Sequence, residues 1–245
     1  MKPRVAFFDF AGCEGDQLQV VNLEEQLLEL LEQVDVVSFR EATSAHSDEY
    51  DIAFVEGSIT RTSDEARLRD IRANAKFLVA IGACATIGGI NAIKNLQDIN
   101  EARRYVYGKD AERFETCQTR PIDAVVKVDA YVHGCPIDRK EFLQVVKALL
   151  LGKKPELPNH PVCVECKAAE NVCTFEKGQF CMGPVIRAGC EAACITQGSI
   201  CWGCRGFVDD PNTDAYKEVL EKYGLDLREV MNKFRLYTAC SEAAR

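Results

Sequence analysis

Short apolar runs alternate with helical patterns over the first 151 residues. The runs are rich in β-branched and aromatic residues, and each has the length of a buried strand. The predicted strands are Val5 to Phe10, Val34 to Phe39, Ile52 to Glu56, Phe77 to Ile81 and Ala124 to Val128. Strands that alternate with helices are typical of a parallel sheet covered by helices. The pattern therefore predicts an α/β fold with a doubly wound parallel sheet.

Helical spacing and capping signals fill the intervals between these strands. Apolar residues recur at helical spacing at Val20, Leu23, Leu27, Leu30 and Leu31. Thr62 with Glu65, and Asp138 with Glu141, have the spacing of capping boxes that open two further helices.

A glycine and two prolines interrupt the pattern between Gly152 and Pro158. Beyond a cysteine-rich stretch with little periodicity, Thr213 or Asp214 is predicted to cap a helix that Gly224 ends, and a second short helix follows from about Asp226. The predicted organisation is a sheet domain (1–152), a cysteine segment (159–208) and a helical tail (209–245).

Eight cysteines lie in the cysteine segment, and they predict metal sites. They are Cys163, Cys166, Cys173, Cys181, Cys190, Cys194, Cys201 and Cys204. Eight thiolates match two 4Fe-4S clusters, but the spacing differs from that of bacterial ferredoxins, so the division of the ligands stays open. A zinc ribbon is the main alternative, with two CxxC pairs as its ligands, although their separation exceeds the usual one and four cysteines are left over.

Charge and composition narrow the function classes. The chain of 245 residues has a formal net charge of -8, which disfavours nucleic acid as a partner. No signal peptide and no apolar stretch of membrane-spanning length is recognised, so we expect a soluble, cytoplasmic protein without membrane insertion. Because disulfides rarely persist in the cytoplasm, the 13 cysteines favour metal ligation over a disulfide framework.

Three more cysteines each follow a predicted strand, namely Cys13, Cys84 and Cys135. The carboxyl ends of parallel strands share one edge, where doubly wound sheets bind ligands, so these thiols are expected to converge on a third cluster. Asp16 occupies the position that would complete a CxxC with Cys13. It is either the fourth ligand, an idle neighbour of a three-iron cluster, or an ordinary acid at a helix N-terminus.

The other candidate residues give weaker indications of function. The loop around Glu14 and Asp16 lacks serine and threonine and is acidic, which disfavours a bound flavin phosphate. His133 is either a neighbour of the third cluster or an ordinary loop histidine. The residues interpreted as structural are His46, His160, Cys117 and Cys240.

Several motifs together resemble the small subunit of NiFe hydrogenases. In the sheet domain these are Cys13-Glu-Gly-Asp-Gln-Leu, Val55-Glu-Gly-Ser, Gly82-Ala-Cys-Ala and His133-Gly-Cys-Pro. In the cysteine segment, Pro161-Val-Cys-Val-Glu-Cys, Cys181-Met-Gly-Pro-Val and Cys201-Trp-Gly-Cys-Arg-Gly are similar to the cytoplasmic sulfhydrogenase delta subunit and its F420- and viologen-linked relatives.

This resemblance implies a flavodoxin-like domain whose proximal cluster faces a NiFe large subunit, and a segment that holds medial and distal clusters. Cys13, Cys84 and Cys135 match the proximal ligands, Glu56 lies near them, and Asp16 stands where the family has cysteine. The electron acceptor would be a flavin/NAD(P), F420 or ferredoxin-linked subunit. The 20 kDa subunit of NADH:ubiquinone oxidoreductase is the related alternative, although it lacks the cysteine segment.

Overall fold

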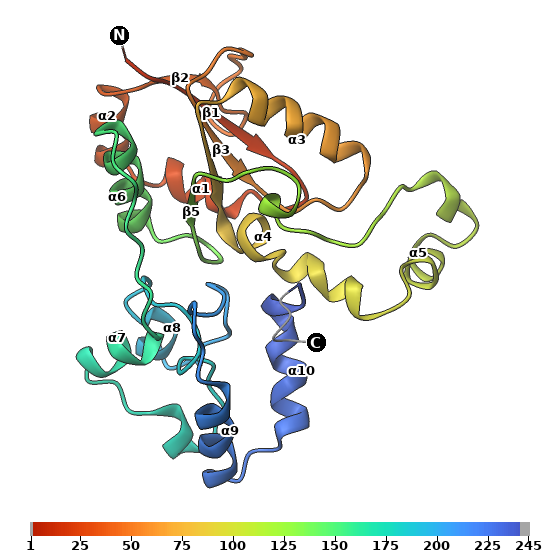
Figure 1. The fold of residues 1–245 in the computed structure, drawn as a ribbon, viewed down its shortest axis with the longest axis vertical. Coiled ribbons are helices and arrows are strands. Elements are labelled where there is room, and N and C mark those ends of the chain that lie inside the picture. Colours follow the sequence, from red (N-terminus) through yellow and green to blue (C-terminus); the bar gives the residue numbers. More distant parts are fainter. Residues whose placement is uncertain (1, 241–245) are drawn as a thin grey trace.

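Five parallel strands form one sheet in the computed structural model, which describes residues 2–240 (Figure 1). The strands are β1 (Arg4–Asp9), β2 (Asp35–Ser38), β3 (Ile52–Glu56), β4 (Phe77–Ile81) and β5 (Ala130–Val132). Their order is β2-β1-β3-β4-β5, and every neighbouring pair is parallel. This is the flavodoxin-like doubly wound order, so the predicted fold class is confirmed.

The predicted last strand at Ala124 to Val128 is wrong. These residues form the end of a 3-10 turn and a loop, and the strand begins at Ala130. Val126 and Val128 are partly buried against the sheet from this loop. The β-branched run therefore reflects burial without a hydrogen-bond ladder.

Helices cover both faces of the sheet (Figure 1). The helical elements of this part are α1 (Gly15–Val21), α2 (Glu25–Leu31), α3 (Ser63–Asn74), α4 (Gly82–Ile87), η1 (Ile90–Leu96), α5 (Ile99–Tyr107), η2 (Gly108–Arg113), η3 (Ile122–Ala124) and α6 (Arg139–Leu150). On one face Phe7 and Phe54 pack with Phe142 of α6, and on the other Phe8 packs with Leu68 of α3. Successive strand residues thus enter two separate cores, as the pleat of a sheet requires.

The capping predictions have mixed outcomes. The Asp138 side chain accepts a hydrogen bond from the N–H of Glu141 at 2.9 Å, which confirms that cap. Thr62 has helical backbone angles and does not cap α3 with its side chain. The Glu115 carboxylate, from a distant segment, instead accepts the N–H of Ser63 at 3.1 Å.

The helix predicted after the cysteine segment has a different cap. Asn212, not Thr213 or Asp214, caps it, because the Asn212 side-chain oxygen accepts the N–H of Ala215 at 2.9 Å. Gly224 lies just beyond the last turn, as predicted.

The cysteine segment shares one apolar core with two C-terminal helices. The helical elements here are α7 (Val162–Ala168), η4 (Thr174–Lys177), α8 (Ala193–Thr196), α9 (Thr213–Lys222) and α10 (Leu227–Thr238). Met182 and Ile186 pack in this core with Leu220 of α9 and Phe234 of α10. The C-terminal helices therefore complete an apolar core to which the cysteine segment itself contributes large side chains.

Helix α10 returns to the sheet domain, where its end packs against η1 and α4 (Figure 1). The chain thus contacts the carboxyl edge of the sheet a second time, far along the sequence. Among residues 2–240, no helix combines the length and the apolar character that crossing a bilayer requires.

Candidate metal centres

Three loops at the carboxyl edge of the sheet carry the isolated cysteines. Cys13 follows β1, Cys84 lies in α4 directly after β4, and Cys135 follows β5. Burial, and then the charges of Cys135, Asp16 and Cys13, raise the pKa of the Cys84 thiol to about 12. The structure thus brings three thiols and Asp16 within range of mutual charge interaction. We call Cys13, Asp16, Cys84 and Cys135 the sheet-edge set.

Asp16 is held by contacts from other segments. Only 6% of it is exposed, and its Oδ1 accepts the N–H of Ile137 at 2.8 Å. A Cβ at Gly82 would lie 1.7 Å from Oδ2 of Asp16, so only glycine allows this approach. Gly82 also has φ of +82°, which other residues rarely adopt. The loops after β4 and β5 therefore fix the Asp16 carboxylate among the thiols.

Glu56 at the end of β3 accepts hydrogen bonds from the start of α1. Its Oε2 accepts the N–H of Gln17 at 2.9 Å, and its Oε1 accepts the N–H of Asp16 at 3.4 Å. Glu56, not Asp16, thus satisfies these free N–H groups of the helix. Burial raises the pKa of Asp16, and burial together with the Asp16 charge raises that of Glu56.

The eight cysteines of the segment divide into consecutive groups of four. A cavity of about 30 Å³ is lined by Cys163, Cys166, Cys173 and Cys181, which we call the first segment set. Cys204 lies near Cys190 and Cys194. Burial and the charge of Cys181 act most strongly on the pKa of Cys201, followed by the charges of Cys204 and Cys190, so Cys201 lies where the two groups meet. We call Cys190, Cys194, Cys201 and Cys204 the second segment set.

The geometry disfavours the zinc ribbon. Its two CxxC pairs lie in different sets, Cys163 with Cys166 in the first and Cys201 with Cys204 in the second. Among residues 2–240, no three His, Cys, Asp or Glu side chains converge closely enough to hold a single metal ion. Four thiols spread around a cavity instead match the donor set of a cluster, whose several irons keep the ligands apart.

The three sets touch in series. Burial raises the pKa of the Cys204 thiol of the second segment set to about 12, and the backbone N–H of Cys135, in the sheet-edge set, lies near enough to oppose this shift. The N–H of Cys201 in turn donates to the Sγ of Cys181, in the first segment set, at 3.4 Å. The second segment set therefore lies between the other two.

Two residues that sequence reasoning left aside contact these sets. Burial raises the pKa of the Cys135 thiol, and the hydroxyl of Tyr237 of α10 lies near enough to oppose this shift. Arg205 directly follows Cys204, is 1% exposed and forms an ion pair with the buried Glu141 of α6. No local signal identifies Tyr237, whereas the arginine next to a CxxC pair was visible in the motif.

Two further candidates, His133 and Cys240, contact residues that belong to none of the three sets. His133 stacks on Tyr131, and burial, followed by the Arg205 charge, lowers its pKa to about 3. The Cys240 thiol donates to the carbonyl of Thr119 at 3.3 Å.

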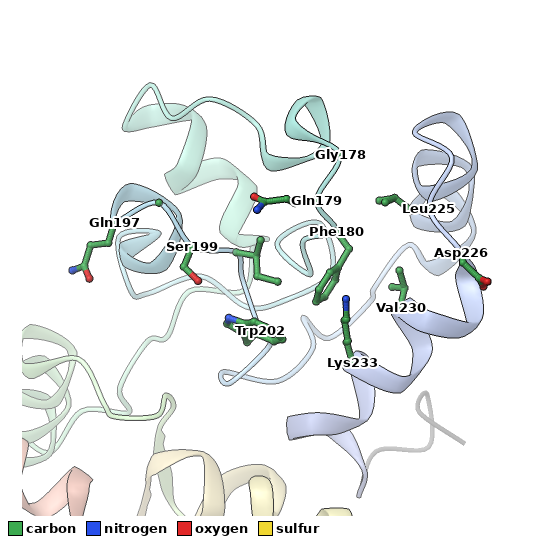
Figure 2. A pocket seen from close by; sticks show the side chains of 12 residues that line it. Gly178, Gln179, Phe180, Gln197, Ser199, Trp202, Leu225, Asp226, Val230 and Lys233 are labelled. Carbon is green, nitrogen blue, oxygen red and sulfur yellow. The ribbon is translucent and has the colours of Figure 1, made fainter.

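A pocket of about 560 Å³ lies where the C-terminal helices meet the cysteine segment (Figure 2). The rings of Phe180 and Trp202 contact edge to face, with 5.6 Å between their centres. Nζ of Lys233 lies 4.6 Å from the centre of the Phe180 ring. In the part of the chain that the structure describes, no cysteine lines this pocket, so it is separate from the three sets.

Comparison with known proteins identifies the family. Residues 13–149 match the family described as the 20 kDa subunit of NADH ubiquinone oxidoreductase. The chain belongs to this family. The curated relatives of this family member include subunit delta of sulfhydrogenase 2 from Pyrococcus furiosus, which is 35% identical and aligns over 96% of this chain and 98% of the relative. A vhu subunit of the F420-non-reducing hydrogenase from Methanocaldococcus jannaschii is 32% identical, with 84% and 82% of the two chains aligned.

Solved structures of this fold are also hydrogenases. A chain of an NAD+-reducing NiFe hydrogenase in the H2-reduced state superimposes with a TM-score of 0.59 at 29% identity, over 64% of this chain and 96% of that chain. An actinobacterial-type NiFe hydrogenase from Ralstonia eutropha H16 gives a TM-score of 0.61 at 16% identity, over 94% and 90% of the two chains, and supports the fold alone. The hydrogenase relatives therefore span both the sheet domain and the cysteine segment.

Proposed function

We propose that this chain is the electron-transfer small subunit of a cytoplasmic NiFe hydrogenase. It relays electrons between the NiFe site of a large subunit and an acceptor module, and it is part of an oxidoreductase whose catalytic site lies in that large subunit. The observation that carries the proposal is the serial arrangement of three four-donor sets, with the backbone of Cys135 near the Cys204 thiol and the N–H of Cys201 bonded to Cys181.

The donor sets fit iron-sulfur clusters. Each segment set offers four thiols, the number that a 4Fe-4S cluster binds, so these sets would hold the medial and distal clusters. Such clusters accept and release single electrons at potentials that the surrounding protein sets. The apolar core of the cysteine segment, which includes Met182 and Phe234, buries Cys181 and Cys201.

The sheet-edge set would hold the proximal cluster. Its buried Asp16 supports ligation of a 4Fe-4S cluster by three thiolates and one carboxylate, because the side chain lies among the thiols without a salt bridge to a basic residue in the part of the chain described. A three-iron cluster, with Asp16 bonded only to Ile137, is the alternative for this set.

The partner we propose at the sheet edge is the NiFe large subunit. Cys13 and Cys135 are exposed there. Helix α5, which follows η1, exposes Tyr105 and Val106, which are 93% and 68% accessible. Exposed aromatic and aliphatic side chains are suited to a protein interface. Electrons would leave at the opposite end through an acceptor subunit linked to flavin/NAD(P), F420 or ferredoxin.

Metal analysis of the chain co-purified anaerobically with its large subunit tests this function. We expect about twelve iron atoms per chain, or about eleven with a three-iron proximal cluster. Zinc in place of iron and sulfide would support a zinc-stabilised scaffold subunit and reject the relay. An iron-loaded chain whose natural partner lacks nickel would support the other family branch, a 20 kDa-like subunit of a non-hydrogenase oxidoreductase.

A further inference from the structure

Arg205 is a buried cation at the junction of the cysteine segment and the sheet domain. It is 1% exposed, and its guanidinium donates to three different segments. Nε donates to the carbonyl of Ala188 at 2.8 Å, Nη1 to the carbonyl of His133 at 2.6 Å, and Nη2 to the Glu141 carboxylate. One side chain thus binds its own segment, the loop after β5 and helix α6. We call these three contacts the Arg205 clamp.

The two ends of this clamp each lie next to a cysteine of a different set. Arg205 directly follows Cys204 of the second segment set, and His133 lies two residues before Cys135 of the sheet-edge set. Between these ends, the backbone N–H of Cys135 lies near the Cys204 thiol. The clamp and the thiol contact therefore join the same two loops.

The chain leaves no space for a side chain at Gly189 beside this ion pair. A Cβ at Gly189 would lie 2.3 Å from Nη2 of Arg205 and 2.7 Å from Oε1 of Glu141. Burial of an ion pair gives little net stability compared with apolar side chains of the same volume. The arrangement is therefore better explained by a requirement for close placement of the two loops than by stability.

We propose that Arg205 is a positioning residue: by binding the carbonyl of His133 and the Glu141 carboxylate, it holds the loop of Cys204 beside the loop of Cys135 and so fixes the separation of two cluster-binding sets. The inference rests on the proposed function and adds to it the connection between the proximal set and its neighbour. Three hydrogen bonds from one buried guanidinium keep the two loops at a constant distance.

Three variants of the chain in complex with its large subunit test this role. The double variant Arg205→Met with Glu141→Leu removes the clamp without leaving a buried unpaired charge. Arg205→Lys keeps the charge but loses the planar fork that reaches three acceptors. Arg187→Met is the matched control, because Arg187 bonds the carbonyls of Pro158 and Phe207 within its own part of the chain.

The measurements are iron content and the electron paramagnetic resonance spectrum of the fully reduced complex. In the unmodified complex, the proposed function predicts that two adjacent paramagnetic clusters split each other's signals. We expect the double variant and Arg205→Lys to retain their iron and to lose or narrow this splitting, while Arg187→Met leaves it unchanged.

Other outcomes separate this inference from the proposed function. Unchanged splitting in both Arg205 variants with full iron would overturn the positioning role and leave the relay intact. Loss of iron from both variants would also overturn it, since Arg205 would then support cluster binding itself. An unmodified complex without iron would reject the relay and this inference with it.

Discussion

The position of Asp16 gives a sharp prediction at Gly82. In Gly82→Ala the new methyl group would meet Oδ2 of Asp16 at 1.7 Å, far inside contact distance. The left-handed backbone at Gly82 adds strain of about 1–2 kcal/mol, and overpacking of this kind costs about 1–3 kcal/mol. We therefore expect Gly82→Ala to lower the free energy of unfolding by about 2–5 kcal/mol.

A double-mutant cycle isolates the contact with Asp16. Asp16→Ala removes the carboxylate that the methyl group meets, so the pair Gly82→Ala and Asp16→Ala should show a favourable coupling of about 1–3 kcal/mol. Gly152→Ala is the matched control. Gly152 has φ of +67° but nothing within 4 Å of an added Cβ, so it should show only the backbone strain of about 1–2 kcal/mol.

The assay is urea unfolding of the full chain under anaerobic conditions, followed by far-ultraviolet circular dichroism. A cost for Gly82→Ala no larger than that for Gly152→Ala would refute the close approach of Asp16. Zero coupling in the cycle would show that the methyl group meets something other than this carboxylate.

Three further outcomes are expected. Tyr237→Phe removes the hydroxyl beside the Cys135 thiol. Because hydrogen bonds to sulfur stabilise the reduced state, this variant should lower the reduction potential of the proximal cluster. An unchanged potential in a redox titration would contradict this. Cys173→Ser should lose up to about four irons, whereas Cys117→Ser, outside the three sets, should keep all of them in the same metal analysis. Phe142→Ala, which empties a fully buried core position, should cost about 3–5 kcal/mol in thermal unfolding, and a cost near zero would contradict the packing between α6 and the sheet.

Loop positions after strands were predictable because they depend on local pattern. The strands β1, β3 and β4 have clear apolar runs, and Cys13 and Cys84 follow two of them closely. The last strand was misplaced because Val126 and Val128 are buried without pairing, and composition does not distinguish these two cases. Cys135 nevertheless lies at the predicted edge, since the true strand ends just before it.

The sequence by itself determined the sheet, the number of donor residues and their consecutive spacing, because periodicity and residue type record local backbone and burial. Only the tertiary structure places Cys163, Cys166, Cys173 and Cys181 around one cavity and brings the backbone of Cys135 near Cys204. It also brought Arg205 to Glu141, 64 residues away, and Tyr237 to the sheet edge. Such contacts depend on how separate elements pack, and residue spacing along the chain does not encode them.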